Sequence, residues 1–167
     1  MSDLSPVDRM LTLARETCDV FVIPAEPFLF TGQAWCDEGR CFITVFRAER
    51  DTMCAYIVAH ELAHHLLQHT RYFSSAPHWL TEHDADVIAL EMLGKVADPA
   101  CVAALRDASR AYLRRCVQAM LDAGITQHGE IEAGLDLGCE IDPALLAAHR
   151  RELARRDLAP DDTEIPF

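Results

Sequence analysis

The feature that most constrains this chain is the segment from residue 56 to 69, YIVAHELAHHLLQH, which is apolar apart from Tyr56, one glutamate, one glutamine and four histidines. An apolar run of this length predicts a buried α-helix. In a helix, residues four apart lie about 40° apart around the axis, so His60 and His64 can aim their imidazoles at one point. Glu61 lies about 100° further round. Burying these groups is unfavourable unless they are satisfied, and a metal ion would satisfy them.

A second group of polar residues follows 18 residues after His64, in the stretch Glu82-His83-Asp84-Ala85-Asp86. A hydrolytic zinc site needs three protein ligands and one open position for water. Glu82 can supply the third ligand from a second helix. Asp86 falls on the same helical face and can accept the other ring N–H of a ligand histidine, which fixes its tautomer. An H-E-x-x-H motif alone has a real false-positive rate, but the two groups together predict one Zn²⁺ held by His60, His64 and Glu82.

The combination of HELAHHLLQH with EHDAD downstream resembles the ImmA/IrrE family of small gluzincin-type zinc metallopeptidases. The pattern of that family runs close to HELGHxxLH and then E-x-E-A-N/D, and the resemblance covers roughly residues 5 to 95. This chain differs at Ala63, where glycine is usual, and at Asp84, where glutamate is common. Neither position is a predicted ligand. The M48-type peptidases share E-x-E-A-D, but they are expected to carry membrane spans, and this sequence contains none.

The resemblance implies a biological role as well as a chemistry. Such enzymes cleave a helix-turn-helix transcriptional repressor and so switch on stress, DNA-damage or anti-phage genes. Because this chain contains no recognisable helix-turn-helix domain, the repressor would be a separate protein. The defence-associated, CapP-like branch of the family is one candidate group. The resemblance also implies that an edge strand of the sheet holds the substrate backbone by strand addition.

The expected mechanism assigns the general base to Glu61, which would take a proton from zinc-bound water and deliver it to the leaving amine. A further group is usually needed to stabilise the oxyanion. Tyr72, His78, His83 and Arg71 are all near enough in sequence, and the pattern does not choose among them. For the histidines, the ordinary alternative is a solvated or structural role.

The chain contains seven cysteines, an odd number without a C-x-x-C pair. This count argues against a secreted disulfide framework and favours a reducing cytoplasm. Cys54 and Cys101 each lie three residues after an aspartate that is expected to cap a helix, where the helix N-terminus favours a thiolate. Such a thiolate could fill the open zinc position and inhibit the enzyme. The alternative is that both are small buried thiols.

The net charge of −12 argues against broad binding to duplex nucleic acid. The charge is uneven, however, because one expected helix carries four arginines. Arg106, Arg110 and Arg114 are spaced four residues apart on one face, with Arg115 beside them. They form a candidate site for single-stranded DNA, as an activator, or for another anion. The alternative is a solvated face that offsets the acidic segment from residue 122 to 142.

The pattern along the chain predicts an α+β fold, with a small, mostly antiparallel sheet packed with helices, zincin-like, and additional C-terminal helices. We expect a metallopeptidase domain over residues 1–124. Residues 125–167 would add an acidic segment, a C-terminal helix and a mobile tail packed on the same domain. The expected helices cover about residues 6–18, 52–69, 77–93 with Gly94 as the stop, 99 to just before Gly124, and 143–156; the expected strands cover 20–23, 28–31, 33–36 and 40–46.

Three function classes remain open from the sequence. The first is a zinc endopeptidase that acts on a protein partner. The second is a non-catalytic, zinc-stabilised interaction module. The third is a generic small zinc protease without a repressor partner. Glu61 favours the first and third classes, because a structural zinc site is closed and has no use for a base. No signal peptide or membrane span is expected, which favours a cytoplasmic protein.

Overall fold

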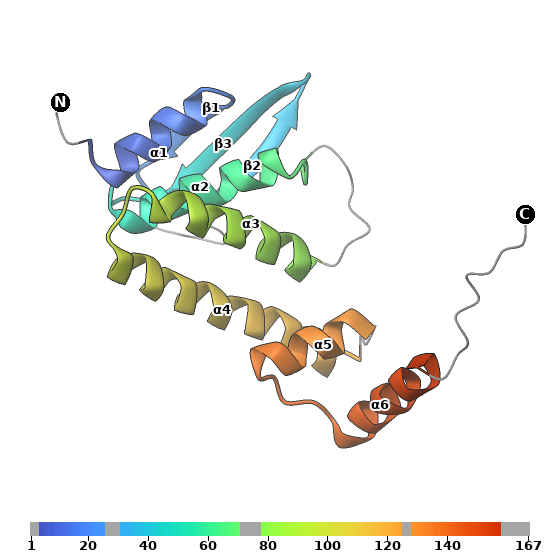
Figure 1. The fold of residues 1–167 in the computed structure, drawn as a ribbon. Helices are drawn as coiled ribbons and strands as arrows, with labels where there is room; N and C mark the ends of the chain where they lie inside the picture. The colour runs from blue at the N-terminus through green and yellow to red at the C-terminus, as the bar shows by residue number, and fades with distance from the viewer. Residues whose placement is uncertain (1–3, 26–30, 71–77, 125–127, 158–167) are drawn as a thin grey trace, which may run out of the picture. The chain divides into compact units, whose positions relative to one another are not determined.

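The computed structural model describes residues 4–25, 31–70, 78–124 and 128–157. The chain divides into two compact units, Met1–Ala111 and Tyr112–Phe167, and the division falls inside a long helix. Each unit is described by itself. The elements are α1 (Pro6–Arg15), β1 (Asp19–Ile23), β2 (Gly32–Asp37), β3 (Arg40–Phe46), α2 (Thr52–Leu66), α3 (His78–Gly94), α4 (Pro99–Asp122), α5 (His128–Leu137) and α6 (Pro143–Asp157) (Figure 1).

The sheet of the first unit is mixed, with the strand order β1-β3-β2. β2 and β3 form an antiparallel hairpin, whereas β1 runs parallel to β3. The hairpin turn places Glu38 at φ 46° and Gly39 at φ 82°, which are the two positive values of a tight primed turn. The α+β class is therefore confirmed, with one parallel pairing in the sheet. The strand expected over residues 28–31 lies almost entirely outside the described residues.

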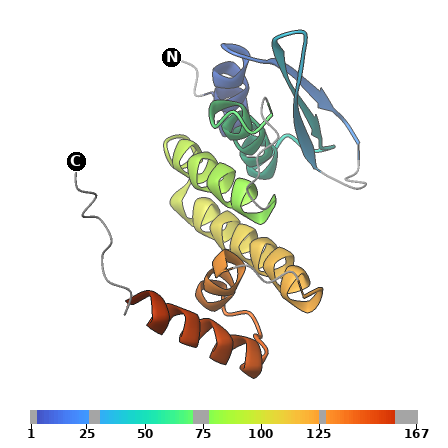
Figure 2. The same cartoon turned by 90° about the vertical axis from the view of Figure 1, so that its right-hand side faces the viewer.

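Helices α1 and α2 cover the same face of the sheet (Figure 1 and Figure 2). Strand residues alternate between the two faces, and Ile43 and Val45 of β3 point into the core, where both are 0% exposed. Val58 and Ala59 of α2 are equally buried, as is Leu93 of α3. Because α2 is covered by α1, α3 and the sheet, any polar side chain on it has to find its partner inside the protein.

Helix α2 begins and ends at identifiable signals. The Asp51 carboxylate accepts a hydrogen bond from the backbone N–H of Cys54 at 3.0 Å, which confirms the predicted cap. The helix ends at Leu66 rather than at His69, because Gln68 takes a left-handed φ of 61°. The backbone N–H of His69 then bonds to the carbonyl of His64 at 2.9 Å, and that of Gln68 to His65 at 3.0 Å. This Schellman-type ending folds His69 back onto the last helical turn.

The later helices follow the predicted order, but the end of α3 differs and there is an additional helix, α5. α3 ends at Gly94 itself, so this glycine is the last helical residue rather than the residue just after the helix. α4 ends before Gly124, whose φ of 72° confirms it as the expected stop. In the second unit, Gln118 exchanges two hydrogen bonds with the backbone of Glu140, at 2.9 and 2.8 Å. Residues 158–167, expected to form a mobile tail, lie outside the described part. None of the described helices combines the length and hydropathy needed to cross a membrane.

Candidate metal centre

The two histidines of the H-E-x-x-H motif and Glu82 meet at one point, as predicted. His60 and His64 come from α2 and Glu82 comes from α3. The Nε2 atoms of the two histidines are 3.1 Å apart. The Glu82 carboxylate places one oxygen 3.3 Å from the Nε2 of His60 and the other 3.4 Å from the Nε2 of His64. All three side chains are partly buried, and each offers one atom that lies within 4.8 Å of the other two. The group is therefore already assembled in the folded chain.

The chemistry and spacing of this group fit a zinc ion. Imidazole nitrogen and carboxylate oxygen are both normal zinc ligands. Two ligand atoms about 2.0–2.1 Å from one zinc at the tetrahedral angle stand about 3.3 Å apart. The two Nε2 atoms are 3.1 Å apart, and each lies 3.3 or 3.4 Å from a different oxygen of Glu82. His60, His64 and Glu82 would therefore hold the ion as three protein ligands. Three ligands leave a fourth position for water or substrate, as in hydrolytic sites.

Asp86 orients His60 in the manner that the sequence predicted. Its carboxylate lies 2.7 Å from the Nδ1 of His60, which leaves Nε2 to face the metal position. The hydroxyls of Tyr56 and Ser109 also donate hydrogen bonds to Asp86. Burial alone would raise the pKa of Asp86, but the hydrogen bonds from His60, Ser109 and Tyr56 lower it below its usual value. The carboxylate therefore stays ionised although it is only 4% exposed.

His69 holds the second ligand histidine in a similar way. Its Nδ1 lies 3.0 Å from the Nδ1 of His64, so the His64 ring also turns its Nε2 toward the metal position. Burial, followed by the charge of His64, lowers the pKa of His69. The sequence analysis assigned no role to His69. Its contact depends on the left-handed backbone of Gln68, and a spacing of five residues is not a same-face spacing in a regular helix.

Glu61 lies between the two motif histidines in sequence, and its side chain packs on strand β2. It is 8% exposed. A Cβ added to Gly32 would come within 2.6 Å of its Oε1 atom, so the carboxylate packs on bare backbone. Burial is the main cause that raises the pKa of Glu61, opposed by the charges of His60 and His64 and by a hydrogen bond from the backbone of Ala34. A raised carboxyl pKa suits a group that must accept and then release a proton near neutral pH.

The electrostatics of the three ligands show how tightly they are coupled. Burial lowers the pKa of His60, but its hydrogen bonds to Asp86 and Glu82 outweigh this and raise it above the usual value. Burial raises the pKa of Glu82, but hydrogen bonds to His60 and His64 lower it well below the usual value. Both pKa shifts favour a protonated His60 beside an ionised Glu82. A metal ion bound here would have to displace the proton of His60, so its affinity would fall at acid pH.

The candidate oxyanion donors differ in their distance from the predicted metal ligands. Tyr72 and Arg71 lie outside the described residues. His78 starts α3 with its Nδ1 3.7 Å from an Oε1 of Glu82, and its side chain is 72% exposed. His83 is half-exposed, and the partner recorded for it within the described part of the chain is Asp84, at 3.4 Å. Of the described candidates, His78 is therefore the one whose side chain lies near the carboxylate of Glu82.

The expectation that Cys54 forms a thiolate is wrong. Cys54 is 0% exposed in the core of the first unit, and burial raises the pKa of its thiol, with Asp51 adding to the effect. The helix N-terminus does not compensate for the loss of hydration. Cys101 is exposed on the first turn of α4. Within the described residues, the group around the metal position consists of two histidines and a carboxylate, without a thiol.

The four arginines of α4 belong to different units. Arg106 and Arg110 are exposed in the first unit, and Arg114 and Arg115 are exposed in the second. The guanidinium of Arg115 lies 5.9 Å from the ring centre of Tyr112, so this arginine makes a cation–π contact within its own helix. Binding of single-stranded DNA or of another anion stays a prediction.

A change at Asp86 that keeps its shape and removes its charge tests its role directly. We expect Asp86→Asn to weaken zinc binding by about 10–100-fold, because the amide cannot hold the His60 tautomer as a carboxylate does. Asp84→Asn is the matched control, since Asp84 lies on the same helix and is exposed. Competition titration against a zinc chelator measures both affinities. Equal affinities in the two variants would show that Asp86 does not orient the ligand.

No protein-family model, curated protein or solved structure matches this chain. The site combines two imidazole nitrogens and a carboxylate that lie close enough to share one ion, an orienting partner for each histidine, and a buried carboxylate beside them.

Proposed function

We propose that this protein is a zinc-dependent endopeptidase that cleaves a partner protein. The observation that carries the proposal is the position of Glu61. A buried carboxylate with a raised pKa adjoins a three-ligand metal position and the backbone of a β-strand. A structural metal site would need a fourth protein ligand and no base. A hydrolytic site needs both the open position and the base.

The bound zinc would polarise the scissile carbonyl and lower the pKa of its water. The other steps fall to residues of the chain. Glu61 accepts the proton of the attacking water and passes it to the leaving amine. Asp86 and His69 keep the ligand imidazoles in the required orientation. His78, with its Nδ1 3.7 Å from Glu82, is the described residue best placed to donate to a developing oxyanion.

Strand β2 provides a surface for an extended substrate. In the described part of the chain, β2 pairs with β3 alone, so its other edge is open. In a hairpin with a two-residue turn, the pairs alternate between hydrogen-bonded and non-hydrogen-bonded. By this alternation, the backbone groups of Gly32, Ala34 and Cys36 face the open edge. Ala34 bonds Glu61 there. A peptide added along this edge would run past the general base.

The resemblance to the ImmA/IrrE family extends the proposal to a substrate. We take a separate helix-turn-helix repressor as the partner, cleaved in a stress, DNA-damage or anti-phage response in the cytoplasm. This part of the proposal rests on the motif resemblance. A generic small protease would share the same site, and a non-catalytic module would share the ligands but would have no need of Glu61 in its buried position.

Replacement of the general base separates a peptidase from an interaction module. We expect Glu61→Gln to lower the cleavage rate by about 10²–10⁴-fold, while zinc content stays the same because Glu61 is not a ligand. The substrate is a proteome-derived peptide library, and new N-termini are counted by mass spectrometry. If zinc-loaded wild type produces no more new termini than Glu61→Gln, the interaction module becomes the better account.

Gly32 offers a second test that leaves the chemical identity of every reacting group unchanged. An alanine Cβ at this position would meet Oε1 of Glu61 and Cγ2 of Ile57, both at 2.6 Å. We expect Gly32→Ala to displace the base and lower kcat by at least tenfold, because misplacing a reacting group by about 1 Å can cost about 10²-fold. Zinc affinity should change little. Gly94→Ala is the matched control, since a Cβ there meets nothing within 4 Å. Unchanged kcat in Gly32→Ala would contradict this placement of Glu61.

A further inference from the structure

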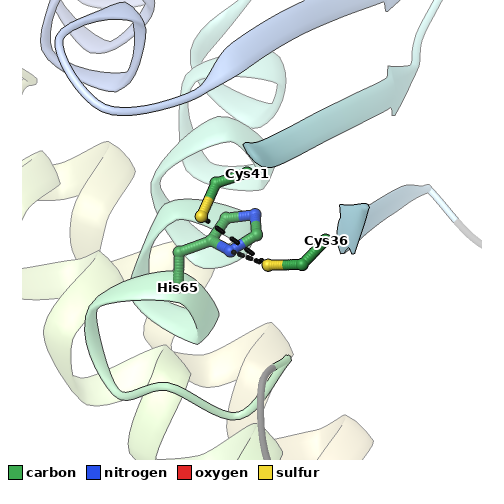
Figure 3. Close-up of side chains that lie close together, drawn as sticks. All are labelled: Cys36, Cys41 and His65. Carbon is green, nitrogen blue, oxygen red and sulfur yellow. Dashed lines mark hydrogen bonds between the residues drawn. The ribbon is translucent and has the colours of Figure 1, made fainter. Parts of the chain in front are cut away.

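A second group of metal-binding side chains lies near the C-terminal end of α2. It consists of Cys36 on β2, Cys41 on β3 and His65 on α2, whose ligand atoms all lie within 4.8 Å of one another (Figure 3). The Sγ of Cys36 is 3.6 Å from the Sγ of Cys41 and 3.8 Å from the Nδ1 of His65. Neither the sequence motif nor the proposed peptidase chemistry uses any of these three residues.

The orientation of His65 is set by a backbone group. Its Nε2 lies 2.8 Å from the carbonyl oxygen of Phe42. A carbonyl accepts hydrogen bonds and cannot donate them, so Nε2 carries the proton and donates it. The lone pair of the neutral ring therefore resides on Nδ1, the atom that faces Cys36 in Figure 3. This pairing of one ring nitrogen with a carbonyl while the other faces a metal position is the usual arrangement of a ligand histidine.

The hairpin holds the two thiols opposite each other. Cys36 and Cys41 are direct cross-strand partners, one pair away from the tight turn at Glu38 and Gly39. Residues two apart on a strand share one face, so Cys41 points to the same side as the buried Ile43, which is the side that α2 covers. Cys36, as the direct partner of Cys41, points to that side as well. Their positions are thus set by the sheet register rather than by a flexible loop, which is the rigidity that a metal site requires.

The spacing matches tetrahedral coordination. Zinc–sulfur and zinc–nitrogen bonds of about 2.3 and 2.0–2.1 Å at tetrahedral angles place two sulfurs about 3.8 Å apart, and sulfur and nitrogen about 3.6 Å apart. The observed values are 3.6 and 3.8 Å. The hydroxyl of Thr70 lies 3.0 Å from the Nδ1 of His65 and 3.4 Å from the Sγ of Cys36. The Thr70 hydroxyl can donate a hydrogen bond to this Nδ1, and a bound metal would take its place.

We propose that Cys36, Cys41 and His65 form a second zinc site, separate from the site of His60, His64 and Glu82. On binding, each thiol releases its proton to solvent, and the two thiolates with the neutral imidazole balance the charge of Zn²⁺. Cys41 also lines an open surface hollow with Arg15, Asp19 and Arg40. The bound ion would tie the β2–β3 hairpin to the last turn of α2.

A cross-strand disulfide is the competing use of the two cysteines. Its S–S bond is about 2.05 Å long, and the two thiols are 3.6 Å apart and reduced. A disulfide would not need the Nδ1 of His65, although the bond from Nε2 to the Phe42 carbonyl turns that atom toward Cys36. The metal site accounts for the two thiols, the imidazole and its bond to the Phe42 carbonyl together.

The test uses the full-length chain, reduced and stripped of metal, in the Glu82→Gln background so that the first site is impaired. Co²⁺ is added as a spectroscopic substitute for zinc, because thiolate ligands give it an intense sulfur-to-metal absorption that nitrogen and oxygen ligands do not. We expect this band to saturate at one Co²⁺ per chain. Cys36→Ser should remove the band. Cys116→Ser, a partly buried cysteine of α4, is the matched control and should retain it.

A second measurement keeps the test independent of how the cysteine variants fold. X-ray absorption at the zinc edge, on zinc-loaded Glu82→Gln, should show two sulfur neighbours at about 2.3 Å. We also expect Cys36→Ser to weaken zinc binding in this background by more than the roughly 10–100-fold that loss of an outer-shell partner costs. A zinc shell without sulfur would overturn the proposal. So would a disulfide between Cys36 and Cys41 in protein that binds zinc only through His60 and His64.

Discussion

The rest of this structure depends on the burial of helix α2, because that helix carries two imidazoles and a carboxylate into the core. Each of these groups has to be satisfied by a neighbour. α3 supplies Glu82 to both histidines and Asp86 to His60. Strand β2 supplies backbone to Glu61. The elements that enclose α2 are therefore the same elements that assemble the metal position.

The parts of the site that could be predicted from the sequence lie within single helices. The four-residue spacing from His60 to His64, and again from Glu82 to Asp86, defines one face of each helix, and the structure brings the two faces together. Ser109 and Gly32 could not be predicted, because they come from distant elements and their role depends on tertiary packing. His69 was missed for a local reason, since the left-handed Gln68 redirects the chain.

The incorrect expectations have physical causes as well. A helix N-terminus favours a thiolate at Cys54, but this thiol lies in the core, where loss of hydration dominates and raises its pKa. Gly94 is the last residue of α3 rather than the residue after it, since a glycine can occupy a helical position at modest cost. The group of Cys36, Cys41 and His65 has no compact sequence signature. Its cysteines are neighbours only across the hairpin, and its histidine lies in the motif helix.

The most direct test of the account is the zinc content of wild type and of Glu82→Gln, prepared identically and measured by elemental analysis. Glu82 touches both ligand histidines, at 3.3 and 3.4 Å, and the substitution removes its charge while keeping its shape. The account predicts that the variant holds about one zinc per chain fewer than wild type and remains folded. Equal zinc content in the two proteins, or none in folded wild type, would contradict a metal centre at His60, His64 and Glu82.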